Sequence, residues 1–149
     1  MKTIIESVII ESTQVFSFLL EEGYNISQNV FNPEINDSIS LRVKFTNVEV
    51  KREIIIDFLP RQQYWLNFLI VKTNLIHESF SISDFAEFKN KKLKNESSLG
   101  YLVKENEFEN DLRRILIQVK NILQTDLKNV INGTGWINVP TVDPRAPYM

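Results

Sequence analysis

The sequence contains no cysteine, one histidine and only four glycines. Without cysteine, neither a disulfide framework nor a thiolate metal site can form. The single histidine, His77, excludes a histidine-based metal cluster, and we expect it to be a solvated loop residue rather than part of a Ser-His-Asp triad. Phosphate-binding loops place several glycines before a helix, whereas Gly133 and Gly135 follow a helical pattern. We therefore assign no catalytic residue, no metal ligand and no cofactor.

Neither sign of charge is in excess, since 17 Lys and Arg stand against 19 Asp and Glu. No global field favours nucleic acid or an anionic membrane. The N-terminal apolar stretch from Ile4 to Leu20 is interrupted by Glu6 and Glu11, so neither a membrane span nor an export signal is expected. The expected protein is cytoplasmic, with no nucleic-acid partner and no membrane partner.

The length and composition predict one globular domain, residues 1–149. Hydrophobic residues make up 43% of the chain and charged residues 24%. A chain of this size can bury about two-thirds of its unfolded surface, so it needs no disulfide or metal to fold. There is no internal repeat and no linker.

Residues 3–22 carry large apolar side chains three and four positions apart, which predicts a helix that Gly23 closes. The high β-branched content leaves a strand over 3–10 as an alternative. Residues 24–37 are polar and Asn-rich, which predicts a loop with a short edge strand near 26–31.

Alternating apolar and polar residues predict strands over 39–45 and 48–58, joined by a turn at Thr46 and Asn47. Arg52 interrupts the apolar file, which places that end near the margin of the sheet. After a turn at 60–62, a third strand over 64–72 is apolar on both faces. Such a strand is either central and covered on both sides, or has an outer face that binds something.

Phe80 and Ile82 predict a short fourth strand, followed by a helix capped by Ser83 and a loop over 89–100. Asn106 is expected to cap the strongest helical pattern of the chain, which runs to Gly133. The tail, residues 137–149, contains three prolines and should be extended. The predicted fold is α+β: a two-layer sandwich of a three- to four-stranded antiparallel meander with an N-terminal helix and a long C-terminal helix.

Two charge clusters have structural explanations that we favour over chemical ones. A carboxylate pair could act as acid and base, but negative charge at the start of the long helix is favourable to the helix dipole. A lysine run can contact nucleic acid, but in a polar loop it is more often solvated. The residues are Glu105, Glu107, Glu109 and Asp111, and Lys89, Lys91, Lys92 and Lys94.

Five residues are candidates for binding a partner: Arg61, Gln63, Tyr64, Trp65 and Trp136. Tyr, Trp and Arg are enriched in protein interfaces, and four of the five cluster beside the turn that precedes the third strand. The competing interpretation is that Trp65 packs in the core under a helix and that Trp136 anchors the tail to the domain.

The order of elements, with an exit that contains Gly133 and Trp136, resembles that of small bacterial proteins encoded beside polymorphic toxins, several families of which are immunity proteins. The resemblance implies a non-enzymatic protein that binds one toxin and blocks it. One alternative is a self-associating structural or accessory protein that pairs through the third strand or the long helix. A second alternative is a small-ligand binder or an enzyme with a cavity between sheet and helices.

Overall fold

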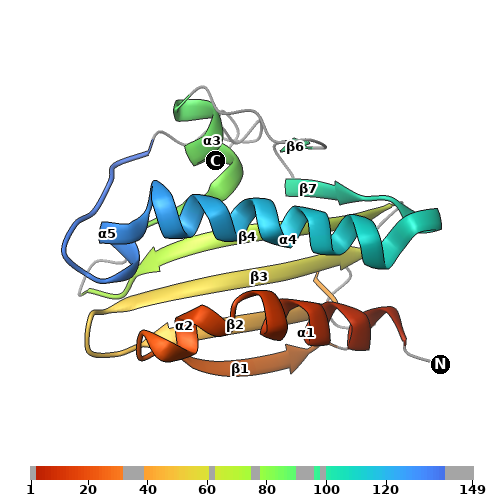
Figure 1. The fold of residues 1–149 in the computed structure, drawn as a ribbon, viewed down its shortest axis with the longest axis horizontal. Helices are drawn as coiled ribbons and strands as arrows, with labels where there is room; N and C mark the ends of the chain where they lie inside the picture. Colours follow the sequence, from red (N-terminus) through yellow and green to blue (C-terminus); the bar gives the residue numbers. More distant parts are fainter. Residues whose placement is uncertain are drawn as a thin grey trace.

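The computed structural model describes residues 3–31, 39–60, 63–74, 78–89, 96–97 and 100–139. These residues form an antiparallel sheet whose helices lie on one face (Figure 1). The predicted α+β class is therefore confirmed. The helices are α1 (Ile4–Val15), α2 (Ser17–Glu21), α3 (Ile82–Phe88), α4 (Phe108–Thr125), α5 (Lys128–Ile131) and the 3₁₀ turn η1 (Glu105–Glu107). The strands are β1 (Asn25–Val30), β2 (Leu41–Asn47), β3 (Arg52–Pro60), β4 (Tyr64–Lys72), β5 (Glu78–Ser81), β6 (Glu96–Ser97) and β7 (Gly100–Val103).

The described strands follow the order β1-β2-β3-β4-β7-β6, and β5 also pairs with β4. β4 pairs with β3 along its whole length. Its other edge is shared by β7, which pairs with Tyr64–Leu66, and by β5, which pairs with Leu69–Lys72. The sheet is therefore larger than the predicted meander of three to four strands, and the predicted strand over 64–72 has a pairing partner on each of its edges.

The core lies between the sheet and the helical layer, in which α1 and α4 run side by side (Figure 1). Phe16 is fully buried, and its ring makes edge contacts with Phe45 and Phe68 of the sheet. From α4, Leu112, Ile115 and Val119 enter the same core. Burying each such side chain contributes about 1.5–3 kcal/mol, so the two long helices fix the layer over the sheet.

The N-terminal segment is helical, and the alternative of a strand over 3–10 is wrong. The Thr3 side chain caps α1 by accepting a hydrogen bond from the backbone N–H of Glu6, at 3.1 Å. The helix is interrupted at Phe16 and resumes as α2. Gly23 follows α2 with a φ of 96°, the left-handed conformation expected there. Burial of one face of α1 outweighs the low helix propensity of its β-branched residues.

The turn between the second and third predicted strands lies later than expected. β2 continues through Asn47, and the turn occupies 48–51. The Asn47 side chain accepts hydrogen bonds from the backbone N–H groups of Glu49 and Val50, which forms the turn locally. Val48 therefore lies in the turn and is 79% exposed instead of entering a strand.

Two predicted helix caps are wrong. Ser81, and not Ser83, caps α3 by accepting from the Asp84 N–H, and Ile82 is helical rather than part of a strand. Asn106 lies in η1, and α4 begins at Phe108 without a side-chain cap at its N-cap residue.

The long C-terminal helix is also shorter than predicted, because it ends at Thr125. The N–H of Leu127 bonds to the carbonyl of Ile122 and closes the helix there, and α5 then runs to Ile131. Gly133 follows with a φ of 83°.

The segment predicted as a loop over 89–100 contains β6 and the first residue of β7. Tyr101 and Val103 of β7 are buried in the core next to the start of β4. The predicted edge strand near 26–31 is confirmed as β1. Among the described helices, none is long and apolar enough to cross a membrane.

Candidate protein-binding face

Consecutive side chains of β4 point to opposite faces of the sheet. Leu66, Phe68 and Ile70 are at most 1% exposed and belong to the core beneath the helices. Trp65, Leu69 and Val71 alternate with them, remain partly exposed and lie outside that core. They therefore occupy the other face of the sheet.

Strand register brings further apolar side chains beside these three. Leu59 of β3 and Leu102 of β7 lie opposite Trp65 from its two sides. Ile55 of β3 lies opposite Leu69 and is 8% exposed, although it too lies outside the core cluster. We call the six residues Ile55, Leu59, Trp65, Leu69, Val71 and Leu102 the apolar face patch. None of the helices that the structure describes packs on this face.

Paired charges border the apolar face patch on the side of β2 and reach into it, because Asp57 of β3 lies between Ile55 and Leu59 and faces Asn67 of β4. Arg42 binds Asp57 through two hydrogen bonds, Nε to Oδ1 at 2.7 Å and Nη2 to Oδ2 at 2.9 Å. The hydrogen bond with Asp57 raises the pKa of the Arg42 guanidinium. Lys44 and Glu53 form a second pair at 3.5 Å. Since each cation has its anion on the adjacent strand, this border is polar but carries little net charge.

Trp65 is thus placed on the face opposite the helices, not beneath one. Its strand was singled out in the sequence because it is apolar on both sides, and the second of these sides lacks cover from the described helices. Its role in binding stays a prediction, but its position is that of a partly exposed aromatic residue between two leucines.

Trp136 lies at the other end of β4. Its ring centre is 5.3 Å from that of Phe80, 5.2 Å from the guanidinium carbon of Arg52 and 5.3 Å from Nζ of Lys72. Trp65 and Lys72 are seven positions apart along the strand, or roughly 23 Å. The structure therefore does not bring the two tryptophans together, and the contacts of Trp136 favour the interpretation that it anchors the C-terminal segment.

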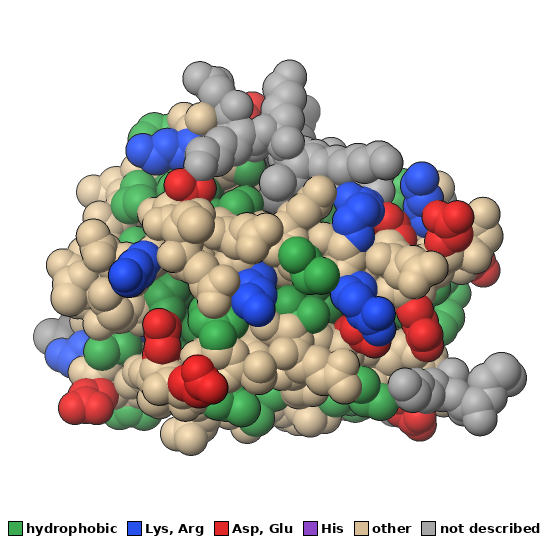
Figure 2. Space-filling view, in the orientation of Figure 1, with side chains coloured by type: hydrophobic (Ala, Val, Ile, Leu, Met, Phe, Trp, Pro, Cys, Tyr) green, Lys and Arg blue, Asp and Glu red, His purple; other side chains and the backbone are tan. Residues whose placement is uncertain are grey.

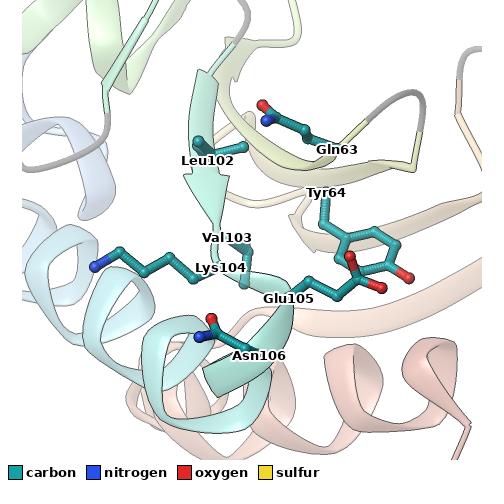
Figure 3. A pocket seen from close by; sticks show the side chains of 7 residues that line it. All are labelled: Gln63, Tyr64, Leu102, Val103, Lys104, Glu105 and Asn106. Atoms are coloured by element: carbon teal, nitrogen blue, oxygen red, sulfur yellow. The ribbon is translucent and has the colours of Figure 1, made fainter.

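Gln63 and Tyr64 line a pocket of about 380 Å³ with residues of β7 and η1 (Figure 3). Tyr64 points to the helix side, where its ring packs 5.8 Å from Phe58 and 5.4 Å from Phe108. The remaining lining residues are Leu102, Val103, Lys104, Glu105 and Asn106. Arg61 lies outside the described residues.

The pocket has the volume of a small-ligand site, but its lining is unusual for one. Such sites are mostly apolar with a few polar groups. Here Gln63, Lys104, Glu105 and Asn106 are all polar and exposed. Figure 3 shows the Lys104 side chain extending away from Tyr64. No group of three His, Asp or Glu side chains that could hold a metal occurs among the described residues.

The acidic cluster lies at the start of the long helix, as expected. Glu109 and Asp111 are in the first turn of α4, and Glu105 and Glu107 are exposed in η1. Asp111 is 6% exposed, accepts a hydrogen bond from the Lys104 N–H at 2.8 Å and pairs with Arg114. These partners give the buried carboxylate a structural role.

Of the other chemical candidates, the structure describes only Lys89. Lys89 is the C-cap residue of α3, and its ammonium lies 5.3 Å from the ring of Phe88. His77, Lys91, Lys92 and Lys94 lie outside the described residues.

Five of the six members of the apolar face patch, all except Trp65, were not among the sequence-derived candidates. Ile55 falls between Ile54 and Ile56, so a period of two assigns it to the solvated face. An apolar residue on that face was a usable signal. Leu59 precedes the proline that ends β3, and Leu102 belongs to a strand that the sequence did not reveal.

Fold and site together define a two-layer α+β protein with helices on one face of the sheet and an apolar patch on the other. A comparison of the chain with protein-family models, curated proteins and solved structures finds no match.

Proposed function

We propose that this protein is a non-enzymatic binding module that contacts a partner protein through the apolar face patch. The observation that carries the proposal is the position of Trp65, Leu69 and Val71 on a face with no described helix above it, where Asn67 is the one polar residue of β4 among them. Protein interfaces combine an apolar centre rich in aromatic residues with a polar rim. The Arg42–Asp57 and Lys44–Glu53 pairs supply such a rim.

The architecture suits recognition by a preformed surface. β4 is hydrogen-bonded to β3 on one side and to β5 and β7 on the other, and its core residues are fully packed. A rigid surface loses little conformational entropy when it binds. We therefore expect the patch to bind with little rearrangement of the sheet.

The specific form of the proposal is an immunity-type inhibitor, a cytoplasmic bacterial protein that neutralises one toxin. The order of elements that suggested this class in the sequence supports it. The partner is then a toxin protein whose own surface offers apolar side chains to the patch.

Copurification with matched valine variants tests the proposal. Tagged wild-type protein, expressed in its native host, should recover one partner in stoichiometric amount. Val71→Lys places a charge in the patch and should reduce recovery at least about tenfold. Val48→Lys makes the same change at a valine of the β2–β3 turn that is 79% exposed, and should recover the partner as well as wild type.

Two results would count against the proposal: no stoichiometric partner, or equal recovery by Val71→Lys and wild type. Circular dichroism of both variants confirms that they are folded. The immunity form has an additional test, because coexpression of the chain should restore growth to cells that express the recovered partner. Without such rescue, the binding module stands and the inhibitor does not.

A second candidate function rests on the pocket at Gln63 and Tyr64. Its volume of about 380 Å³ falls in the range of small-ligand sites. A thermal-shift screen of metabolites and nucleotides should then give a hit whose effect is lost in Tyr64→Ala. Complete absence of a shift would remove this candidate.

A further inference from the structure

The outer edge of β1 is open in the described structure. β1 pairs with β2 only and ends the sheet. Just beyond it, the N–H of Phe31 donates to the carbonyl of Ser40 at 2.9 Å and continues the ladder. Bonded pairs alternate in an antiparallel ladder, so Ser27 and Asn29 bond to β2 in the same way. The N–H and C=O groups of Ile26, Gln28 and Val30 therefore point away from the sheet, and no described residue bonds to them.

Among the residues that the structure describes, this edge lacks the usual protection against strand pairing. Edge strands are normally blocked by lysine, proline, a bulge or short length. β1 has six residues, Asn-Ile-Ser-Gln-Asn-Val, with no charge and no proline, and it pairs with β2 in unbroken register. Val30 near its end is 62% exposed. The strand is thus able to accept another strand along its full length.

The sequence of β1 is complementary to itself. When two copies run antiparallel with Gln28 opposite Gln28, Ile26 of each lies opposite Val30 of the other. These are the residues whose backbone groups point outward. Each outward N–H of one copy therefore meets a C=O of the other copy. All three side chains lie on the helix side of the sheet, because Ile26, Gln28 and Val30 pair with the buried Phe45, Val43 and Leu41. Apolar residues would then face each other across the junction, with no like charges opposed.

The flank of α1 above this edge is apolar as well. Ser7 and Glu11 bond to Glu109 and Arg113 of α4, which fixes the flank that faces α4. At 100° per residue, Ile5 and Ile9 lie on the opposite flank, towards β1 (Figure 1).

Ile5 and Ile9 of α1 are only partly buried against the core, and so is Ile26 of β1. Hydrophobic side chains reach the surface along this margin of the molecule (Figure 2). Joining two copies at β1 brings two such flanks together and removes their apolar side chains from water.

We propose that two copies of this chain associate through antiparallel pairing of β1 about a twofold axis at Gln28, which joins their sheets into one. A twofold axis uses the same patch on both copies, and self-complementarity of β1 is what such an interface requires. The proposal is independent of the function proposed above. The pairing uses the edge of β1, whereas the apolar face patch belongs to β3, β4 and β7 and lies on the face of the sheet away from the helices.

The test is the mass of the purified protein by sedimentation or light scattering across a concentration series. Wild type should approach twice 17.4 kDa at high micromolar concentration. Gln28→Pro removes an N–H that points to the second copy and leaves the hydrogen bonds to β2 intact. This variant should therefore have the monomer mass of 17.4 kDa. Val30→Lys places a charge opposite Ile26 and should weaken association by roughly tenfold or more.

Two matched variants locate the interface. Val48→Lys and Val71→Lys make the same change in the turn and in the apolar face patch, and both should remain dimeric. Wild type that is monomeric at every concentration overturns the proposal. A dimer that persists in both Gln28→Pro and Val30→Lys also overturns it, and so does a dimer that only Val71→Lys dissociates. In each of these cases the two copies would associate through another surface. Unchanged circular dichroism shows that each variant is folded.

Discussion

Replacement of Arg52 by methionine should destabilise the protein far more than the loss of a surface charge. The Arg52 residue is 6% exposed, at the start of β3. Its Nε donates to the carbonyl of Val130 at 2.9 Å, and its Nη2 donates to the carbonyl of Gly135 at 3.0 Å. The guanidinium also lies over Trp136. One side chain thus fastens the end of α5 and the following segment to the sheet.

The magnitude follows from the groups that lose their partner. Burial lowers the pKa of the Arg52 guanidinium, and no described carboxylate pairs with it, so its hydrogen bonds to carbonyls replace lost hydration. A buried acceptor left without a donor costs about 1–3 kcal/mol. Val130 retains a hydrogen bond from the Gly133 N–H, which places its cost at the lower end. Adding Gly135 and the contact with Trp136, we expect a loss of about 3 kcal/mol in the free energy of unfolding.

Urea unfolding followed by tryptophan fluorescence measures this loss. The control is Lys44→Met, which removes a partly exposed ion pair with Glu53 and should cost no more than about 0.5 kcal/mol. A loss below about 1 kcal/mol for Arg52→Met, or one equal to that of the control, would refute the reasoning that buried hydrogen bonds to the two carbonyls hold the C-terminal segment.

Gly133→Ala should lower the free energy of unfolding by about 2 kcal/mol in thermal melts. The new Cβ would lie 2.6 Å from Cβ of Val50, and the residue has a φ of 83°. The control, Gly135→Ala, meets only ordinary contacts and should be near neutral. Tyr24→Phe removes a hydrogen bond of 2.6 Å to the carbonyl of Ile131 and should cost about 1 kcal/mol at neutral pH. Burial raises the pKa of Tyr24, so its folded state holds the proton more tightly than its unfolded state and loses stability as pH rises above about 10. The stability gap between wild type and Tyr24→Phe should therefore narrow above that pH, and a constant gap would contradict the assignment.

Local signals in the sequence were sufficient for most elements of the fold. The alternation over β2 reflects burial of its apolar residues, and one of the two apolar sides of β4 is buried in the same way. Gly23 and Gly133 both take the left-handed conformation that closes a helix. In these cases the residue pattern is typical of one local structure, alternating apolar residues of a strand and glycine of a helix end, so the pattern predicts the structure.

Other features depend on contacts between distant segments and could not be predicted. Arg52 was interpreted as evidence that its end of the strand lies near the margin of the sheet. In the structure it is buried and donates to two carbonyls about eighty positions later in the chain. The cap of α3 is Ser81 rather than Ser83, and both serines precede the same apolar run. β7 is too short to show a period, and only its pairing with β4 defines it.

The sequence named one residue of the apolar face patch. Trp65 was selected as an interface-type residue beside the turn before its strand, and it lies on the face of the sheet opposite the core. Trp136 was selected by residue type alone, and its contacts with Arg52 and Phe80 explain it as an anchor. Leu102 joins the patch only through strand pairing, which no local pattern encodes.

Hydroxyl-radical footprinting of the complex with the recovered partner tests the central claim most directly, because it reports the solvent exposure of individual side chains. The account predicts that binding protects Trp65, Leu69 and Val71, while Phe88 and Ile117, which are 45% and 43% exposed on the helical side, react as in the free protein. Protection of Phe88 or Ile117 with unchanged reactivity of the apolar face patch would contradict it.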